Sequence, residues 1–230
     1  MDLRTRILEA AADLLSRSTE ADFSTRAVCE AAGIGAPQLY RQFGDKEGLL
    51  SAVVDYGFER YLAGKRAARP SADPVRDLRD GWDNHVAFAV EHPNYYRLMY
   101  SPGLSTPPEA AAEAHRLLLG VLERCAAAGR LRVSPQVAAQ MVMSANTGVA
   151  LSLITRPAIY PDPGFSAQVR EAVFAAVTVP GDEPPATGRT TGVAAATLGA
   201  LLRETPPAVL SAAETALLHQ WLTALADAPE

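Results

Sequence analysis

The segment TRAVCEAAGIGAPQLYRQFGDKEGLL, residues 25–50, decides the fold of this chain. The Ser24-Thr25 pair can cap a short helix that ends at Gly33, because glycine tolerates the left-handed backbone that closes many helices. A second short helix follows, with Pro37 in its first turn. Backbone amides of the first turn have no partner within the helix, so the amide hydrogen that proline lacks is not missed there. Gly44 ends this second helix. The segment therefore predicts two short helices joined by a tight glycine turn.

The second helix has two different faces. At about 100° per residue, one side carries Ala36, Leu39 and Phe43 and is predicted to face inward. The opposite side carries groups that can contact DNA, namely Pro37, Gln38, Arg41 and Gln42, with Tyr40 at the border. This geometry presents a recognition helix to a major groove. The alternative for such a pattern is an ordinary pair of packed helices.

Three short motifs distinguish these possibilities: Ala32-Gly33-Ile34, Leu39-Tyr40-Arg41-Gln42-Phe43 and Asp45-Lys46-Glu47-Gly48-Leu49-Leu50. Together they resemble the TetR family of bacterial transcriptional repressors, over roughly residues 5 to 62. The resemblance implies an all-α fold. Its expected parts are an N-terminal three-helix DNA-binding domain at 1–48, with a helix-turn-helix, and a larger helical ligand-binding and dimerisation domain at 49–230.

Within such a helix-turn-helix, residue type suggests roles for individual side chains. Arg41 and Gln38 can read base edges, Arg to guanine and Gln to adenine, each good pair being worth ~1–3 kcal/mol. Pro37 can touch a thymine methyl, with Ala36 and Gln42 beside it. Phosphate contacts that fix register are expected from Thr25, Arg26, Tyr40 and Lys46. The family often has a small polar residue where this chain has Gly35, and a histidine where it has Gln42.

Composition places the chain among globular proteins, with 48% hydrophobic and 20% charged residues over 230 positions. A net charge of −5 is unfavourable for a protein that must neutralise phosphates, so DNA binding has to depend on local charge. The N-terminus lacks the apolar core of a signal peptide, and we expect a cytoplasmic protein with no membrane partner. Cys29 and Cys125 lack metal-ligand spacing, and we expect no cofactor.

Helix start and stop signals continue to the C-terminus. Residues 3–17 have a helical apolar period, and Asp73-Pro74, His92-Pro93, Thr106-Pro107 and Ser134-Pro135 each mark a predicted helix start. Further helices are expected at 166–178, 192–204 and after Ser211, whose capping box includes Glu214. No alternating strand pattern occurs. The last two helices lie beyond the shortest TetR-like plan, and they either thicken a dimer interface or cover the core.

The resemblance implies a ligand pocket and a homodimer within the second domain. The segment WDNHVAFAVEHPNYYRLMY, residues 82–100, resembles the helix, His-Pro and aromatic pattern of TetR-like core domains. Candidates to line a pocket for an unknown, largely apolar small molecule are Trp82, His85, Phe88, Tyr96, Met99, Tyr100 and Asn146; ordinary core packing is the alternative for each. The helices near 134–156 and 166–178 are expected to form a four-helix dimer bundle.

These observations predict a dimeric, sequence-specific transcriptional repressor that a small ligand releases from a palindromic double-stranded operator. The alternative is a ligand-binding helical protein whose degenerate helix-turn-helix no longer binds DNA. An enzyme is not expected, because the sequence contains no metal-binding repeat, nucleophile elbow, phosphate loop or dinucleotide fingerprint.

Overall fold

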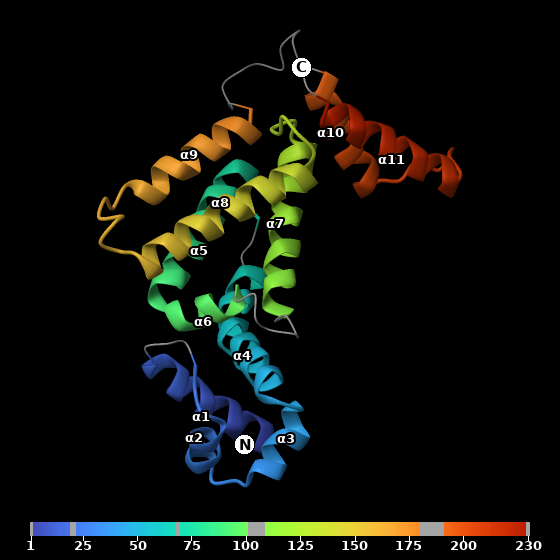
Figure 1. The fold of residues 1–230 in the computed structure, drawn as a ribbon. Helices are drawn as coiled ribbons and strands as arrows, with labels where there is room; N and C mark the ends of the chain where they lie inside the picture. The colour runs from blue at the N-terminus through green and yellow to red at the C-terminus, as the bar shows by residue number, and fades with distance from the viewer. Residues whose placement is uncertain (1, 19–21, 68–69, 101–108, 180–190, 229–230) are drawn as a thin grey trace. The chain divides into compact units, whose positions relative to one another are not determined.

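The computed structural model describes residues 2–18, 22–67, 70–100, 109–179 and 191–228, and these fold as helices (Figure 1). The first six helices are α1 (Leu3–Arg17), α2 (Thr25–Ala32), α3 (Ala36–Phe43), α4 (Lys46–Ala67), α5 (Pro74–Glu91) and α6 (Pro93–Met99). The other five are α7 (Glu109–Ala127), α8 (Pro135–Thr155), α9 (Phe165–Val177), α10 (Thr191–Glu204) and α11 (Ala212–Ala226).

The chain divides into two compact units. Unit 1 comprises Met1–Ala68, Ala87–Ala114 and Ala150–Pro157, and unit 2 comprises Arg69–Val86, His115–Val149 and Ala158–Glu230. Helices α5, α7 and α8 therefore each contribute residues to both units. The predicted functional boundary at 48/49 stays a prediction.

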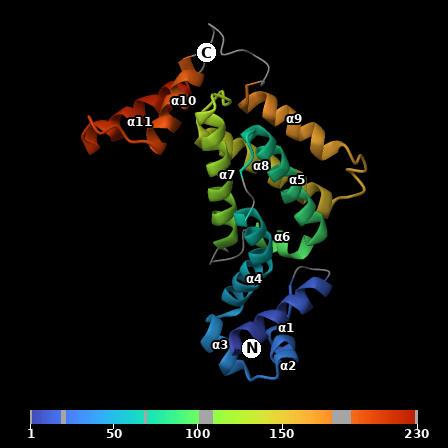
Figure 2. The ribbon, with the colours of Figure 1, turned by 180° about the vertical axis from the view of Figure 1, so that it is seen from behind.

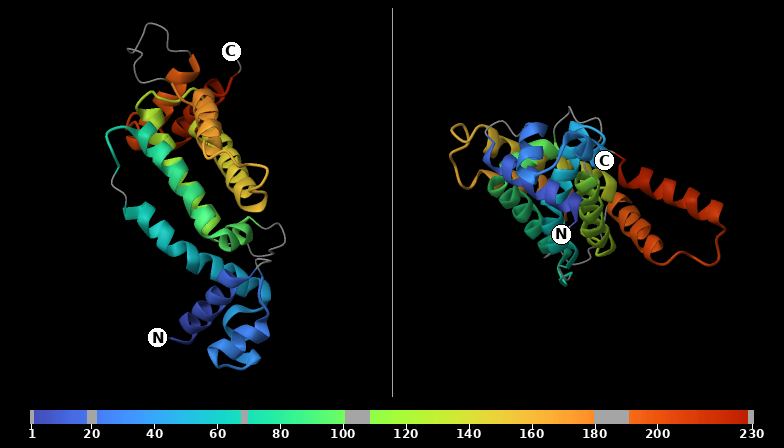
Figure 3. Two further views of the ribbon diagram at one scale, coloured as in Figure 1. Left: turned by 90° about the vertical axis from the view of Figure 1, so that its left-hand side faces the viewer. Right: turned by 90° about the horizontal axis from the view of Figure 1, so that it is seen from below.

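Unit 1 is built around α1, α4 and α6. The buried side of α1 carries Ile7, Ala11 and Leu15, which recur at the three- and four-residue spacing of one helix face. The buried residues of α4 are Leu49, Leu50, Val53, Val54, Phe58 and Leu62, and they surround much of that helix. A helix with so many buried sides packs against several neighbours, and α4 contacts α1, α3 and α6. Helices α1, α2 and α3 lie together at one end of unit 1 (Figure 3).

Unit 2 has its own core, to which Leu78, Trp82, Leu122, Val142 and Phe174 contribute buried side chains. A single isolated bridge between Leu131 and Thr178 ties the α7–α8 connection to the end of α9. Helices α10 and α11 pack side by side as a hairpin, which lies beside the start of α8 and apart from α9 (Figures 1 and 2).

Most helix bounds agree with the expectations from sequence. Gly129, two residues after the end of α7, has a φ of 68°, and Ser211 and Glu214 form the predicted capping box of α11. The predicted start at Thr106-Pro107 lies outside the described residues. Helix α8 is long and apolar enough, by composition alone, to cross a membrane. Core helices of soluble proteins pass the same test, and one side of α8 is buried in unit 2 through Ala138, Ala139 and Val142.

Candidate nucleic-acid interface and regulatory core

The turn between α2 and α3 has the geometry that the sequence predicts. Ser24 caps α2 by accepting a hydrogen bond from the Ala27 amide at 3.2 Å, and Gly33 ends it with a φ of 63°. The Ile34 amide then donates to the Cys29 carbonyl at 3.0 Å, closing the last turn. A side chain with a Cβ is strained at this φ, so glycine fixes the angle between the two helices.

Helix α3 is anchored by one fully buried residue, Leu39, and by the half-buried Phe43. Its outer face exposes Pro37, Gln38 and Arg41, and Tyr40 is 43% exposed. The prediction that Ala36 faces inward is wrong: Ala36 is exposed. As the first residue of the helix, directly after the N-cap Gly35, it lies before the first contact with the core.

Three of the predicted DNA-contacting side chains have partners within unit 1. The Gly35 amide donates to Gln38 Oε1 at 3.1 Å, so Gln38 caps its own helix and keeps its amide NH₂ available. Lys46 Nζ lies 2.7 Å from Asp22, and Arg26 Nε lies 2.9 Å from Glu30. All these groups are at least partly exposed. The contacts can therefore be exchanged for phosphate contacts.

Asp22 shows the electrostatic effect of its pairing. Partial burial raises the pKa of this carboxyl. The hydrogen bonds from Lys46 and from the Phe23 amide lower it by more, so the net pKa lies below the usual value. The carboxylate is thus ionised at neutral pH beside Lys46. Arg41, in contrast, has no ion-pair partner among the described residues and is exposed. It is the best placed cation on α3 for a new contact.

Two arginines of α1 belong to this surface, and the sequence analysis did not identify them. Arg4 donates to the Gln42 carbonyl at 3.1 Å and stacks over the Phe43 ring at 4.6 Å. Arg6 donates to the Ala32 carbonyl at 3.1 Å. Each guanidinium thus meets the C-terminal end of a helix, where cations are favourable. Through these contacts Arg4 attaches α3 to α1, and Arg6 attaches α2 to α1.

The charge of the interface is low. The predicted DNA-binding domain, residues 1–48, contains six basic and eight acidic residues. Of the basic residues that follow it, Arg66 pairs with Glu59 at 2.9 Å and with Glu113 at 3.1 Å, so it serves the fold of unit 1. Residues 1–48 therefore supply no excess of positive charge, and contacts of this region with DNA would have to come from a few placed side chains.

Helix α6 is hydrogen-bonded to α1 within unit 1. The buried Asn94 donates from Nδ2 to the Leu15 carbonyl at 2.8 Å and to the Ser18 carbonyl at 2.7 Å, which satisfies the C-terminal end of α1. The Tyr95 hydroxyl donates to the Ala12 carbonyl at 3.3 Å. The Tyr95 ring also lies against Gly57 of α4, closely enough that a Cβ there would fall 2.4 Å from it.

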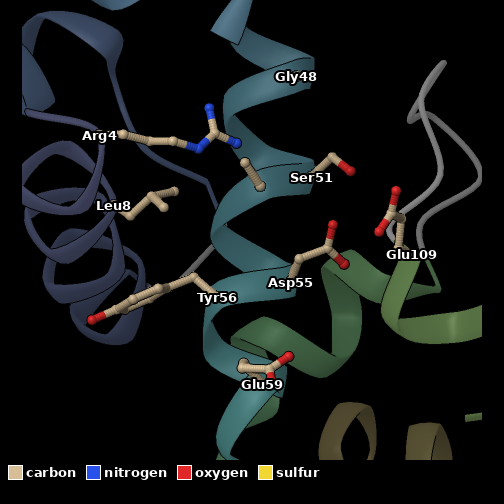
Figure 4. A pocket seen from close by; sticks show the side chains of 9 residues that line it. Arg4, Leu8, Gly48, Ser51, Asp55, Tyr56, Glu59 and Glu109 are labelled. Atoms are coloured by element: carbon tan, nitrogen blue, oxygen red, sulfur yellow. The ribbon is translucent and has the colours of Figure 1, made fainter. Parts of the chain in front are cut away.

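A cleft of about 460 Å³ lies on unit 1 beside α4 (Figure 4). Its walls carry Arg4, Leu8, Gly48, Ser51, Ala52, Asp55, Tyr56, Glu59 and Glu109. Two of its carboxylates have structural partners: Asp55 accepts a hydrogen bond from the Ala110 amide at 2.9 Å, and Glu59 pairs with Arg66. The polar groups of this cleft therefore have a structural role, because Asp55 of α4 caps the N-terminal end of α7 there.

The predicted ligand-binding residues fall in two groups. In unit 2, the Trp82 indole nitrogen donates to Ser166 Oγ at 3.1 Å, and Asn146 Nδ2 donates to the Trp82 carbonyl at 3.3 Å. His85 is buried there as well. In unit 1, Tyr96 and Met99 are buried, and the half-buried Phe88 and Tyr100 each contact another aromatic ring.

Two polar atoms of α8 are buried without a hydrogen-bond partner among the described residues, namely Asn146 Oδ1 and Thr147 Oγ1. Buried polar groups in proteins are normally paired, so each of these oxygens has capacity for a further donor. The amide nitrogen of Asn146 is thus fixed by the Trp82 carbonyl, while its amide oxygen can still accept a hydrogen bond.

An ion-pair chain crosses unit 2 between α5 and α9. Arg79 donates to both carboxylate oxygens of Glu171, at 3.1 and 2.8 Å, and Arg170 pairs with Glu171 and Asp83. The hydrogen bond from Arg79 lowers the pKa of Glu171 most strongly, and Arg170 adds to the effect, so that this pKa falls to about 2 although partial burial opposes the shift. The ion pair between Arg79 of α5 and Glu171 of α9 therefore joins these two helices.

Comparison with known proteins gives two family matches. Residues 7–53 match "Bacterial regulatory proteins, tetR family", and residues 78–171 match "Tetracyclin repressor-like, C-terminal domain". No curated protein matches the chain significantly.

Solved structures share the fold at low identity. FadR from Bacillus subtilis in complex with stearoyl-CoA is 15% identical, with a TM-score of 0.62, over 75% of this chain and 98% of that one. A transcription regulator from Shewanella sp. PV-4 is 17% identical, with a TM-score of 0.58, over 78% and 100%. NalD, the secondary repressor of the MexAB-OprM multidrug efflux pump in Pseudomonas aeruginosa, is 19% identical, with a TM-score of 0.54, over 76% and 95%.

Proposed function

Because this chain belongs to the tetR family of bacterial regulatory proteins, a family of transcription regulators and not of enzymes, we propose that it is a dimeric repressor released from its operator by a small ligand. The observation that carries the proposal is α3, which is held by the buried Leu39 and displays Gln38, Tyr40 and Arg41 on its exposed face. Such a helix can enter a major groove without rearrangement of the fold.

Sequence readout is assigned to two side chains. Arg41 is exposed without an ion-pair partner in the described chain and can bind guanine through two hydrogen bonds, and the free NH₂ of Gln38 can donate to a base. Thr25, Arg26, Tyr40 and Lys46 then fix the register on phosphates. A two-fold symmetric dimer predicts a palindromic operator with half-sites separated by whole helical turns.

The ligand is proposed to be largely apolar with at least one hydrogen-bond donor. In unit 2, the Trp82 ring favours apolar contacts and the unpartnered oxygen of Asn146 favours a hydrogen-bond donor. In unit 1, the aromatic residues Phe88, Tyr96 and Tyr100 form a separate group that also favours apolar contacts. The Bacillus subtilis protein of similar fold was solved with stearoyl-CoA, a ligand with a long apolar chain. A coupling of ~1–3 kcal/mol between ligand and DNA would change operator affinity ~5- to 150-fold.

The second candidate function is a ligand-binding protein whose helix-turn-helix no longer binds DNA. Two observations favour it: acidic residues outnumber basic ones in 1–48, and Arg26 and Lys46 are paired to carboxylates. The two functions differ in one measurable property, which is saturable binding to a specific site.

The test is a fluorescence anisotropy titration against DNA from around the gene, at two salt concentrations and with competitor DNA. Arg41→Ala removes one arginine–guanine pair in each half-site of the dimer complex, and since one good pair is worth ~1–3 kcal/mol, specific binding should weaken at least ~30-fold. Arg76→Ala removes an exposed arginine of α5 and should leave affinity unchanged. If the parent shows only binding that competitor DNA erases, for this DNA and for sites selected from random DNA, the second function holds.

A ligand screen then tests the release mechanism. Fatty-acyl thioesters and other apolar compounds are titrated into the operator complex, and binding to free protein is measured in parallel. A compound that binds the free protein in the core but leaves operator affinity unchanged would overturn release by that ligand.

A further inference from the structure

The hairpin formed by α10 and α11, hereafter the C-terminal hairpin (191–226), is an addition to the shared family fold. The second family match ends at residue 171. The similar structures are covered over 95% to 100% of their own length, yet they account for only 75% to 78% of this chain. A segment that relatives of the same fold do without has a role particular to this protein.

Small residues form the inner seam of the hairpin. Ala195, Ala196, Leu222 and Ala226 are its buried cluster, and a Cβ placed on Gly199 would lie 3.7 Å from the Leu222 Cβ. Small side chains let the two helices approach closely. Leu202 and Leu218 are partly buried against this cluster, whereas five other large apolar side chains of the hairpin lie outside the seam.

Those larger side chains are on the outside. Leu217, Trp221 and Leu225 recur at four-residue spacing on one face of α11 and are 43%, 58% and 47% exposed. Leu198 and Leu201 of α10 are each 46% exposed. Isolated exposed leucines are normal, but five large apolar side chains on one two-helix element form a patch that normally marks an interaction site.

The patch is turned away from the body of unit 2. The hairpin is fastened at its base, where the Ser134 amide and hydroxyl both donate to Asp227 at 3.0 Å. Thr223 lines the seam with the start of α8, and at 100° per residue Trp221 lies roughly 160° around α11 from it. Figures 1 and 2 show the two helices beside one another, projecting from the side of α7.

Charge narrows the class of partner. Between 191 and 226 the charged residues are Arg203, Glu204 and Glu214, so the hairpin has a net charge of −1. Nucleic acids and anionic membrane surfaces attract clusters of Lys and Arg, which this element lacks. A nearly neutral face of leucine and tryptophan matches the apolar centre of a homodimer interface.

We propose that the C-terminal hairpin is a dimerisation arm, whose Leu198, Leu201, Leu217, Trp221 and Leu225 face packs on a second copy of this chain. The proposal rests on the homodimer of the proposed function and adds the surface that stabilises it. It supplements the contact expected from α8 and α9, where Met141, Ser144 and Gly148 expose a further apolar and small-residue face.

The available area suits this role. Five side chains about half exposed present roughly 400–500 Å² of apolar surface per copy, taking about 200 Å² for a buried aromatic and somewhat less for a leucine. A two-fold contact uses the patch twice and buries nearly the ~1,000 Å² total that a specific interface needs. With a contribution from the outer face of α8 the interface exceeds that limit.

The test uses the full chain and two measurements. In sedimentation equilibrium, Trp221→Glu combined with Leu217→Glu should raise the dimer dissociation constant at least tenfold, while Gln220→Glu, an exposed polar position on the same helix, should leave it unchanged. Circular dichroism should show equal helix content in all three proteins, because the substituted side chains are exposed in the protomer. An unchanged dissociation constant in the double variant would overturn the proposal.

Tryptophan quenching provides the second measurement, because Trp82 is only 2% exposed and acrylamide quenching therefore reports on Trp221. Quenching should fall as the parent protein dimerises with rising concentration. If acrylamide still quenches Trp221 fully in the dimer, other helices form the interface, and the proposal that the hairpin is a dimerisation arm is refuted. Operator binding by the parent is measured separately: if it fails while Trp221 becomes protected, the arm stands and the repressor does not.

Discussion

Replacing Asn94 by alanine should loosen the attachment of α6 to α1 within unit 1. Asn94 is only 8% exposed, and its single NH₂ group serves two carbonyls at the C-terminal end of α1, at 2.8 and 2.7 Å. An internal hydrogen bond contributes ~0.5–1.5 kcal/mol, and the variant loses two of them, although the Leu15 carbonyl still accepts from the Ser18 amide at 3.1 Å. We therefore expect the variant to lose ~2 kcal/mol of unfolding free energy.

The measurement is urea unfolding followed by circular dichroism, with thermal unfolding as a second probe. For a chain of this size a loss of ~2 kcal/mol lowers the Tm by ~4–8 °C. Asn84→Ala is the matched control, because Asn84 is exposed on α5 and its replacement should change the Tm by less than about 1 °C. A Tm of Asn94→Ala within the range of this control would refute the structural role of the two hydrogen bonds.

The same variant tests how the core communicates with the DNA-binding helices. If α6 transmits the state of the core to α1, Asn94→Ala should reduce the fold-change in operator affinity that an inducing ligand produces, although Asn94 is not among the predicted DNA-contacting or ligand-binding residues. Equal fold-changes in the parent and the variant, in the presence of the expected loss of stability, would mean that the contact is structural only.

Three further outcomes are expected. Gly57→Ala should destabilise the protein by ~1–3 kcal/mol because its Cβ would clash with the Tyr95 ring, whereas Gly81→Ala on α5, where nothing lies within 4 Å, should stabilise it by ~0.5–1 kcal/mol in urea unfolding. The depressed pKa of Glu171, about 2, means that its ionised form stabilises the fold fully above pH ~4.5 and that this contribution is lost as the pH falls toward 2, so the stability difference between the parent and Glu171→Gln should shrink over that range. Burial raises the pKa of the Cys125 thiol to about 12, so in a variant whose other cysteine is serine a thiol reagent at pH 8 should react only after urea is added; rapid reaction of the native protein would contradict the buried position.

The helix-turn-helix was predictable because its determinants are local. Gly33 and Gly44 adopt φ values of 63° and 78°, and Ser24 caps the helix that it precedes. Such features depend on a few neighbouring residues, which the sequence displays directly. The apolar period of 3–17 likewise located α1 to the residue, since burial of one face sets that period.

Contacts between distant residues were not predictable. Arg4 and Arg6 read as ordinary solvated charges, because nothing near them in the sequence indicates that they meet carbonyls 26 and 38 positions away. The burial of α11 was not predictable either, because the sequence left open whether this helix covers the core: of its large apolar residues Leu217, Leu218, Trp221, Leu222 and Leu225, only Leu222 is buried. A hairpin that lacks a second covering layer cannot bury apolar residues on all sides, and the sequence does not show how many layers are present.

The acidic balance of the DNA-binding region is compatible with specific binding and opposes unspecific binding. Exposed ion pairs such as Lys46–Asp22 contribute only ~0–1 kcal/mol each, so a phosphate in the right place can replace the carboxylate at little cost. On unspecific DNA the same exchange gains almost nothing, because one weak partner replaces another and the remaining carboxylates repel the backbone. Arg41 alone among the predicted cations starts without such a partner in the described chain. Discrimination should therefore come mainly from α3, at the position where an arginine can distinguish guanine from other bases.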